Sequence, residues 1–555
     1  MAARVFKIDE LATYIATHLL AISPESTVAL ALTCRALEGP VLKLLWEMED
    51  SLQLLIIRVL AMEAFYFSLP DRAGLYLLVS FLFSSSRHLS YSTVMKNQQA
   101  LRRPLTTWEL NRLKRYASWM RRLQVREWGL SEELTRFVLP TPTGDPPVLR
   151  LHLRELDWWL NETNLSFLLE FLSPHLTEII ITASNFIRPG EAIEPWDGLP
   201  DKVVPEMRSA IKLFPPSLQI LDIHLGSGLQ TYITEEISAF ILGCGDSFRE
   251  LNTNSALSTQ AIVHLMKLPN LCAWVTEQGP PQVTDLIRCG IPDDVVSIFP
   301  SLKTLGLRSE PALEWLTLFE AAKNRTSPWV MAGNSLSSIS YHHPTLPVDS
   351  FLVSRFLQFA NLVDITIETG CSLLSCKSQF TDQDVERLAL ALPKLEVLVL
   401  GGWPCGADTC LTTVHSLLSL SACCTELKHL AIHFCVANLQ ADILDMFDYA
   451  YSQGLHSSPK CALEELVTGE IRFEPAHHDP RLISLGMLMI FPSLARYITS
   501  SPTWAPLDAM VKGLGQIKEI AAVTENLMRY LNEERESVNN GVPARSTVGS
   551  PHFSW

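Results

Sequence analysis

The stretch TDQDVERLALALPKLEVLVL, residues 381–400, holds one complete unit of the pattern that decides the fold. Thr381 stands where a helix cap is expected, and Asp384 follows three residues later. Four apolar residues then recur at helical spacing and line one face: Val385, Leu388, Ala389 and Leu392. The segment 395–400 is a short, mostly apolar run typical of a buried strand. This unit therefore predicts a helix followed by a strand.

The Leu-x-x-Leu-x-apolar pattern of that strand recurs along the chain. The clear copies begin at Leu153, Leu176, Leu218, Leu302, Leu362, Leu395 and Leu427. Weaker copies begin at Phe248, Leu271, Leu336 and Leu463. The mean spacing between copies is 31 residues, and individual spacings run from 23 to 42.

Short buried strands that alternate with covering helices at such intervals are typical of leucine-rich repeats. We therefore predict an α/β fold, with an irregular leucine-rich-repeat solenoid, or horseshoe, over residues 148–500. A regular repeat places Asn or Cys three positions after the third apolar residue, and only Asn161 and Cys435 do so here. The alternative is a set of buried strands in another α/β domain.

The first 46 residues predict three short helices. The first ends before Ser23-Pro24, the second runs from about Thr27 to Gly39, and Pro40 opens the third. So short a unit has too little interior for its apolar residues, so it must pack on the rest of the chain or on another protein. Periodicity alone is equally consistent with a cap on the N-terminal end of the solenoid.

The order of these elements, with Cys34-Arg35-Ala36-Leu37 and Trp46, resembles an F-box, by which substrate receptors bind the Skp adaptor of Skp/cullin/F-box ubiquitin ligases. The opening VFKIDEL and the segment 101–125 are similar to F-box proteins of mushroom-forming fungi. The family usually opens with a Leu-Pro pair, whose place Ile8-Asp9 takes here. The resemblance implies an adaptor-binding surface of Ile8, Leu11, Ile15, Leu19, Leu32, Cys34, Leu37, Pro40, Leu44 and Trp46.

Composition and charge narrow the classes of partner and compartment. The chain is 47% hydrophobic and 19% charged, which predicts a folded protein over most of its length. A formal net charge of -15 does not favour nucleic acid or anionic lipid as a partner. The start lacks a signal-peptide core, and no apolar run approaches the about 20 residues that span a membrane. The 12 cysteines are then expected to be reduced, buried thiols, in the cytoplasm, the nucleus or both.

A basic segment, residues 102–126, has eight Lys or Arg residues against one acid, Glu109. Such a density could indicate contact with RNA or lipid. Trp108, Met120 and Leu123 lie among apolar residues at helical spacing, which favours a connecting helix with one buried and one solvated face.

The sequence has no known catalytic motif and only a loose metal-ligand spacing. The chain has no G-x-S-x-G, Walker, H-E-x-x-H or G-x-G-x-x-G motif, so we expect no catalytic or cofactor-binding residue. Seven cysteines lie between Cys371 and Cys435, where loose spacing admits a zinc site. Burial of free thiols at repeat positions is the favoured explanation, so no metal is expected.

Together these features predict five regions. They are an F-box at 1–50, a helical linker at 51–147, the solenoid at 148–500, a helical cap at 501–536 and a disordered tail at 537–555. The expected function is the substrate-recognition subunit of a ubiquitin ligase, whose partners are a Skp adaptor, through it a cullin, and a target protein. The alternative is a repeat scaffold outside any ligase, which the absent Leu-Pro pair supports.

Overall fold

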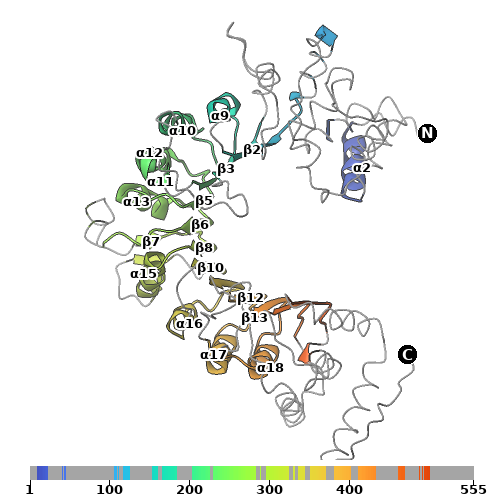
Figure 1. The fold of residues 1–555 in the computed structure, drawn as a ribbon, viewed down its shortest axis with the longest axis vertical. Coiled ribbons are helices and arrows are strands. Elements are labelled where there is room, and N and C mark those ends of the chain that lie inside the picture. The colour runs from blue at the N-terminus through green and yellow to red at the C-terminus, as the bar shows by residue number, and fades with distance from the viewer. Residues whose placement is uncertain are drawn as a thin grey trace, which may run out of the picture. The chain divides into compact units, whose positions relative to one another are not determined.

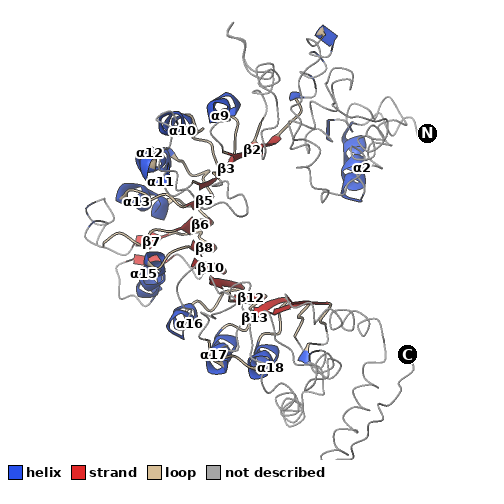
Figure 2. Ribbon diagram, viewed as in Figure 1, coloured by secondary structure: helices blue, strands red, loops and turns tan. Residues whose placement is uncertain are grey.

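The protein is described by a computed structural model that divides into two compact units, Met1–Leu302 and Lys303–Trp555. The described residues are 9–22, 41, 43–44, 106–108, 111, 115, 117–125, 153–160, 165–183, 203–225, 229–282, 285, 288, 296–323, 329–331, 336–343, 350–369, 380–401, 411–432, 461–468, 487, 490–491 and 493–499. Each unit is built from parallel strands and helices that alternate along the chain (Figures 1 and 2).

The first unit contains six parallel strands that pair in chain order. They are β1 (Arg122–Val125), β2 (Glu155–Trp159), β3 (Glu178–Thr182), β4 (Ile220–His224), β5 (Glu250–Thr253) and β6 (Ala273–Thr276), and β7 (Val296–Ile298) follows. The pairing aligns one buried residue from each strand in a continuous row: Leu123, Leu156, Ile179, Leu221, Leu251 and Trp274. This row forms the centre of the hydrophobic core.

Helices lie along one side of these strands (Figure 1). They are α9 (Leu165–Phe171), α10 (Val203–Lys212), α11 (Leu229–Tyr232), α12 (Thr234–Gly243) and α13 (Thr259–Lys267). Each turns apolar residues inward, as α13 does with Ile262 and Leu265. Consecutive strands at the spacing of a repeat thus bury one face against helices and leave the other face open.

The second unit repeats this organisation with seven parallel strands in chain order. They are β8 (Thr304–Leu307), β10 (Ser338–His343), β11 (Asp364–Thr369), β12 (Val397–Leu400), β13 (His429–Ile432), β14 (Glu465–Thr468) and β15 (Arg496–Thr499), with β9 (Trp329–Met331) apart from them. The helical segments are η2 (Pro311–Leu313), α15 (Glu314–Lys323), α16 (Ser350–Phe356), α17 (Asp382–Ala391) and α18 (Val414–Cys423).

The repeat prediction is confirmed at the level of strands. All eleven predicted copies contain a strand, and the first and second apolar residues of every copy are buried. The capping box predicted at Thr381 and Asp384 is also present: each side chain accepts a hydrogen bond from the backbone N–H of the other residue. The α/β fold and the repeat therefore follow from the sequence pattern.

The helix predicted over 102–126 is wrong at its C-terminal end, because residues 122–125 form β1 and pair with β2. Met120 and Leu123 have the spacing of a helical face, but the same spacing opens a Leu-x-x-Leu-x-apolar copy that ends at Val125. Pairing with β2 makes residues 122–125 a strand and not the end of a helix. Trp108, predicted on the buried face, is 63% exposed. The repeat strands therefore begin before the predicted boundary at residue 148.

A second missed copy lies at the other end of the array, where Leu494 leads into β15. Its strand sequence, RYIT, lacks the aliphatic residue expected at the second apolar position, which is Tyr497. Register with β14, where Tyr497 lies opposite Leu466, identifies it as a repeat strand. The predicted cap at 501–536 and the tail at 537–555 lie outside the described residues.

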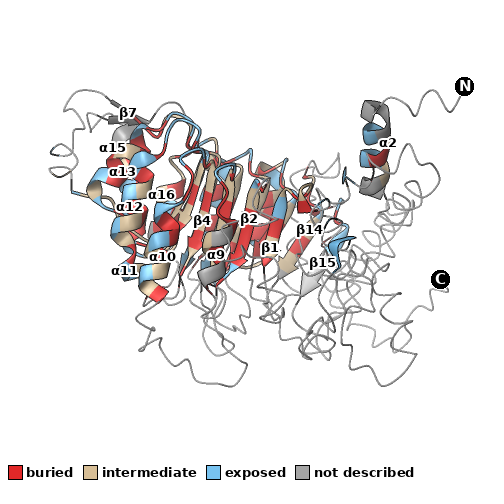
Figure 3. Cartoon of the chain, turned by 90° about the horizontal axis from the view of Figure 1, so that it is seen from above, coloured by how far each residue is buried: buried red, intermediate tan, exposed pale blue. Residues whose placement is uncertain are grey.

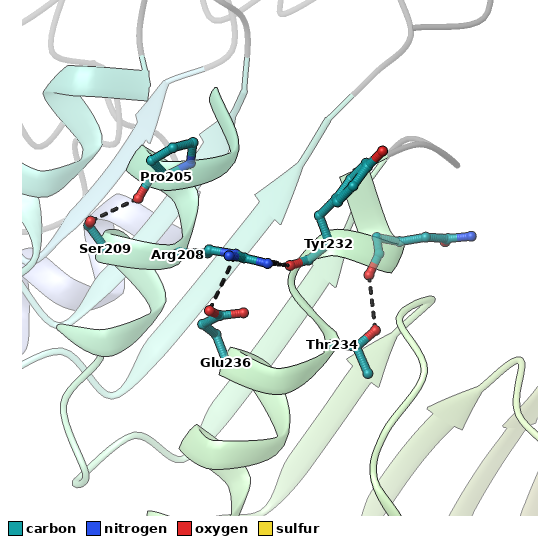
Figure 4. Close-up of polar contacts among 7 residues, drawn as sticks. Pro205, Arg208, Ser209, Tyr232, Thr234 and Glu236 are labelled. Atoms are coloured by element: carbon teal, nitrogen blue, oxygen red, sulfur yellow. Dashed lines mark hydrogen bonds and ion pairs between the residues drawn. The ribbon is translucent and has the colours of Figure 1, made fainter. Parts of the chain in front are cut away.

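Arg208 joins the outer helices of the first unit, as Figure 4 shows. Its guanidinium on α10 donates to the carbonyl of Tyr232 at 3.1 and 2.8 Å, and its Nε lies 3.3 Å from a carboxylate oxygen of Glu236 on α12. Tyr232 is the last residue of α11, where a helix leaves carbonyls without intrahelical donors. One side chain thus stabilises the turn between α11 and α12 against α10.

Buried thiols support the repeat positions of both units. Burial raises the pKa of Cys244 to about 12, that of Cys424 to about 12 and that of Cys461 to about 11. The Sγ of Cys424 donates to the carbonyl of Leu392 at 3.6 Å, and that of Cys461 donates to the carbonyl of Cys424 at 3.4 Å. These cysteines act as small core residues with a weak donor.

Because the thiolate is the reactive species, we expect Cys244, Cys424 and Cys461 to resist iodoacetamide in the folded protein at pH 8 and to react after unfolding. Mass spectrometry of tryptic peptides, labelled before and after addition of guanidinium, measures this. Cys423, which is half-buried beside Cys424, serves as the internal comparison. Labelling of the three buried thiols at the rate of unfolded protein would contradict the assignment.

Within the described residues, no helix has both the length and the apolar character needed to span a bilayer.

Candidate interaction surface of the first unit

The strands of the first unit expose alternate residues on the side away from the helices. Residues that face the helices are buried, whereas those between them are mostly half-buried, as the alternating colours of the strands in Figure 3 show. Carboxylates from four neighbouring strands gather there: Glu155, Asp157, Glu178, Asp222 and Glu250. We call these five residues the acidic face.

Register places the acidic face in two rows. Glu155 lies opposite Glu178. On the next strand, Ile220 lies opposite both Glu178 and Glu250, so all three glutamates share one row. The second row, two residues along each strand, holds Gln124, Asp157, Ile180, Asp222 and Asn252. Neighbouring strands are about 4.8 Å apart, so like charges in each row are close.

The first row holds three carboxylates, Glu155, Glu178 and Glu250, and one cationic side chain, Arg122. Nε of Arg122 lies 3.6 Å from a carboxylate oxygen of Glu155, but both side chains are about half exposed, so the pair contributes at most about 1 kcal/mol. The pKa of Glu178 is raised, first by burial and then by the neighbouring charge of Glu155. Arg122 opposes that shift, and a further cation beside this partly buried carboxylate would stabilise its charged form.

Hydrogen bonds leave acceptors unused in the second row. Asp157 is only 8% exposed, and one of its oxygens accepts from Nε2 of Gln124. Its other oxygen, Oδ1, has no hydrogen-bond donor within the described residues, and neither has Oδ1 of Asn252. Asp222 accepts from Nδ2 of Asn252 at 3.1 Å, and its Oδ1 lies 3.1 Å from Nε2 of His224.

An aromatic residue borders these carboxylates. Trp159 follows Asp157 by two residues on β2, so it lies on the same side of the strand, and it is 37% exposed. Its register partner on β3 is Thr182, which pairs in turn with His224. The open side of the first unit therefore combines carboxylates with an accessible indole ring.

Two amide side chains at this border have a structural role that the sequence pattern did not predict. Asn254 accepts from the backbone N–H of Leu225 at 3.1 Å and donates to its carbonyl at 2.6 Å. Gln278 does the same for Leu257 at 2.7 and 2.9 Å. Each amide thus forms hydrogen bonds with the loop backbone of the preceding repeat. A regular repeat assigns this role to the Asn or Cys position, which Asn161 and Cys435 occupy, and both lie outside the described residues. The repeat pattern did not identify Asn254 and Gln278, because they follow the third apolar position by one and two residues and the pattern expects three.

The open side of the second unit has different chemistry, because its carboxylates have partners. Asp364 accepts from the hydroxyls of Ser338 at 3.2 Å and Thr366 at 3.3 Å. Glu465 lies between His429, at 3.6 Å, and Arg496. Burial raises the pKa of Asp364, and the two hydroxyl hydrogen bonds oppose that shift. The acidic face of the first unit is thus the stronger candidate for a ligand.

Most residues of the predicted adaptor-binding surface lie outside the described part of the chain: Ile8, Leu32, Cys34, Leu37, Pro40 and Trp46. The first predicted helix is present as α2 (Asp9–Ile22) and ends before Ser23-Pro24, as expected. It contains Leu11, together with half-buried Ile15 and Leu19, while Leu44 is a half-buried helical residue. The adaptor-binding surface of ten residues therefore stays a prediction.

No group of three His, Cys, Asp or Glu side chains among the described residues could hold a metal ion. The cysteines considered for zinc at 371, 376, 405, 410 and 435 lie outside them. In the basic segment, Arg121 donates to the carbonyl of Ser118 at 3.2 Å, and Arg115 lies 5.3 Å from the ring centre of Trp119. These contacts give both arginines a structural role.

Comparison with known proteins finds a likeness among solved structures. No protein-family model and no curated protein matches the sequence. Among solved structures, the chain is similar to the leucine-rich repeat-containing protein LegL7 from Legionella pneumophila, with 11% identity and a TM-score of 0.33 over 65% of this chain and 97% of that chain. The repeat assignment rests on the strands and registers described above.

The charge on Glu178 has a consequence for stability. Since its pKa is raised on folding, the folded state binds more protons than the unfolded state, and stability falls as pH rises above the ordinary value of 4.5. We expect Glu178→Gln to raise the free energy of unfolding at pH 7 and to leave it unchanged well below pH 4.5. Urea titrations at both pH values measure the difference, with Glu235→Gln on α12 as the control. An equal effect at both pH values would contradict it.

Proposed function

We propose that this protein is a non-catalytic receptor that binds another protein on the open side of its repeats. The observation that carries the proposal is the acidic face, in which Oδ1 of Asp157 has no donor among the described residues and partly exposed Trp159 lies on the same strand. Flat arrays of strands that expose alternate side chains suit protein partners, because many side chains can contact one surface at once.

We further propose that residues 1–50 form an F-box that binds a Skp adaptor and, through it, a cullin. The support is the resemblance at Cys34-Arg35-Ala36-Leu37 and Trp46, together with the helix α2 at the expected place. The receptor then works by position: it holds a target lysine near a charged conjugating enzyme and so raises its effective concentration. Such a complex would act in the cytosol or nucleus.

Co-expression with a Skp adaptor tests the F-box. We expect a one-to-one complex that survives size-exclusion chromatography and is lost on Leu37→Asp or Trp46→Ala. Leu390→Asp, which changes an exposed leucine of α17, is the matched control and should retain the complex. A folded chain that forms no complex would overturn the F-box proposal and favour the repeat scaffold outside a ligase.

A further inference from the structure

We infer that the acidic face binds an extended segment of the partner protein that is rich in lysine or arginine. The inference rests on the protein-binding function proposed above and names the chemistry of the partner. Four independent features of the first unit point to it: charge, an unused buried acceptor, an aromatic neighbour and strand spacing.

Charge is the first feature. Five carboxylates converge on the open side of four adjacent strands. Beside them lie Arg122, close to Glu155, and His224, which is close to Asp222 and cationic only when protonated. The carboxylates of the second unit, by contrast, already have hydroxyl, imidazole or guanidinium partners. Positive charge from a partner would complement the five carboxylates of the first unit.

The second feature is the buried oxygen of Asp157. A carboxylate that is more than nine-tenths buried normally satisfies its acceptors, because a buried acceptor without a donor is costly. Oδ1 of Asp157 has no donor among the described residues, while Gln124 occupies only Oδ2. An ammonium or guanidinium group supplies several N–H donors at once and neutralises the charge.

Trp159 is the third feature. It lies on the same side of β2 as Glu155 and Asp157, and it is 37% exposed. Lysine and arginine are attracted to the face of an indole ring when they lie within about 6 Å of its centre. A carboxylate and an indole on one strand therefore bind the same cationic side chain by two mechanisms that favour arginine and lysine over neutral residues.

Strand spacing sets the form of the segment. Glu155 and Glu178 lie on adjacent strands, about 4.8 Å apart, and Glu250 is two strands further, at about 10 Å. An extended peptide that crosses the strands advances about 3.3 Å per residue and turns alternate side chains to the same side. Basic residues at alternate positions of such a segment thus face the carboxylates of the first row.

Peptide binding to the full-length protein tests the inference. The probe is a fluorescein-labelled heptapeptide of alternating lysine and serine, measured by fluorescence anisotropy at about 0.1 M salt, where the Debye length is about 10 Å. The same peptide with glutamate in place of lysine is the negative probe. We expect saturable binding of the lysine peptide and none of the glutamate peptide.

Two triple variants separate the acidic face from the overall negative charge of the chain. The first triple variant should lower the affinity for the lysine peptide by about tenfold or more. It combines Glu155→Gln, Glu178→Gln and Glu250→Gln. The second triple variant changes the net charge equally at positions outside the acidic face, and should change the affinity for the lysine peptide by less than about twofold. It combines Glu206→Gln, Glu235→Gln and Asp246→Asn. Thermal melts followed by circular dichroism establish that both variants are folded.

Trp159 gives a second, independent readout. Trp159→Ala should lower the affinity for the lysine peptide by about threefold. Trp159→Phe keeps an aromatic face and should lower the affinity less. Equal loss of affinity in the two triple variants would overturn the inference, because charge alone would then explain binding. So would equal binding of the glutamate peptide.

The inference and the F-box proposal fail in distinguishable ways. A chain that co-purifies with the Skp adaptor but does not bind the lysine peptide contradicts only the inference. A chain that binds the peptide through the acidic face, but not the adaptor, supports the inference and makes the protein a receptor outside a ligase.

Discussion

Trp274→Ala is expected to lower the free energy of unfolding by about 3–5 kcal/mol. Trp274 occupies the second apolar position of its repeat, is fully buried, and stacks on Phe299 with ring centres 5.2 Å apart. Phe299 itself has a positive φ of 49° and donates its N–H to the carbonyl of Met266 at 2.8 Å. Removing the indole leaves a cavity beneath a residue whose backbone is already strained.

Urea denaturation monitored by circular dichroism measures this effect. Trp159→Ala is the comparison, since it removes the same side chain from the open side of β2, where Trp159 is 37% exposed, whereas Trp274 is fully buried. We expect it to cost less than Trp274→Ala, because it leaves no enclosed cavity. Trp274→Phe, which retains an aromatic ring, should fall between the two. Equal destabilisation by both alanine variants would mean that the indole of Trp274 is not a core group.

The second large effect concerns Asp382 at the start of α17, where Asp382→Ala should cost about 2–4 kcal/mol. Its carboxylate accepts from the backbone N–H of Thr413 at 2.7 Å, from the hydroxyl of Thr413 at 2.6 Å and from the hydroxyl of Ser416 at 2.5 Å. Ser416 is fully buried, so its hydroxyl would lose an acceptor that water cannot replace. These bonds join the N-terminus of α17 to that of α18.

Urea denaturation again provides the measurement. Gln383→Ala, an exposed substitution in the same turn, should change stability by less than about 0.5 kcal/mol. Asp382→Asn keeps one acceptor oxygen and should lose an intermediate amount. A cost for Asp382→Ala no larger than that for Gln383→Ala would show that the network contributes nothing to stability.

The two predictions differ in how visible their residues are in the sequence. Trp274 lies in a weak copy of the repeat, Leu271-x-x-Trp274-x-Thr276, where the periodic position alone marks it as buried. Asp382 stands beside the recognisable capping box of α17, but its partners are 31 and 34 residues away. Local pattern identifies the first residue, whereas only the packing of neighbouring repeats identifies the role of the second.

The acidic face illustrates the same division. Alternation within a strand predicts which residues leave the core, so Glu178 and Glu250 could be assigned to the open side from sequence. With spacings from 23 to 42 residues, however, the sequence does not say which open-side residues lie next to each other. Register between neighbouring strands brings Glu155 beside Glu178 and aligns Asp222 with Asn252.

By itself the sequence determined the repeat, its strands and the capping of α17, because each depends on residues within one turn or one strand. The tertiary structure decided that residues 122–125 form a strand and that β15 belongs to a further repeat. It also decided which carboxylates lie side by side. These depend on pairing between segments more than 20 residues apart. A spacing of three residues fits a helical face and a repeat strand equally well, and only the free energy of pairing with a neighbouring strand distinguishes them.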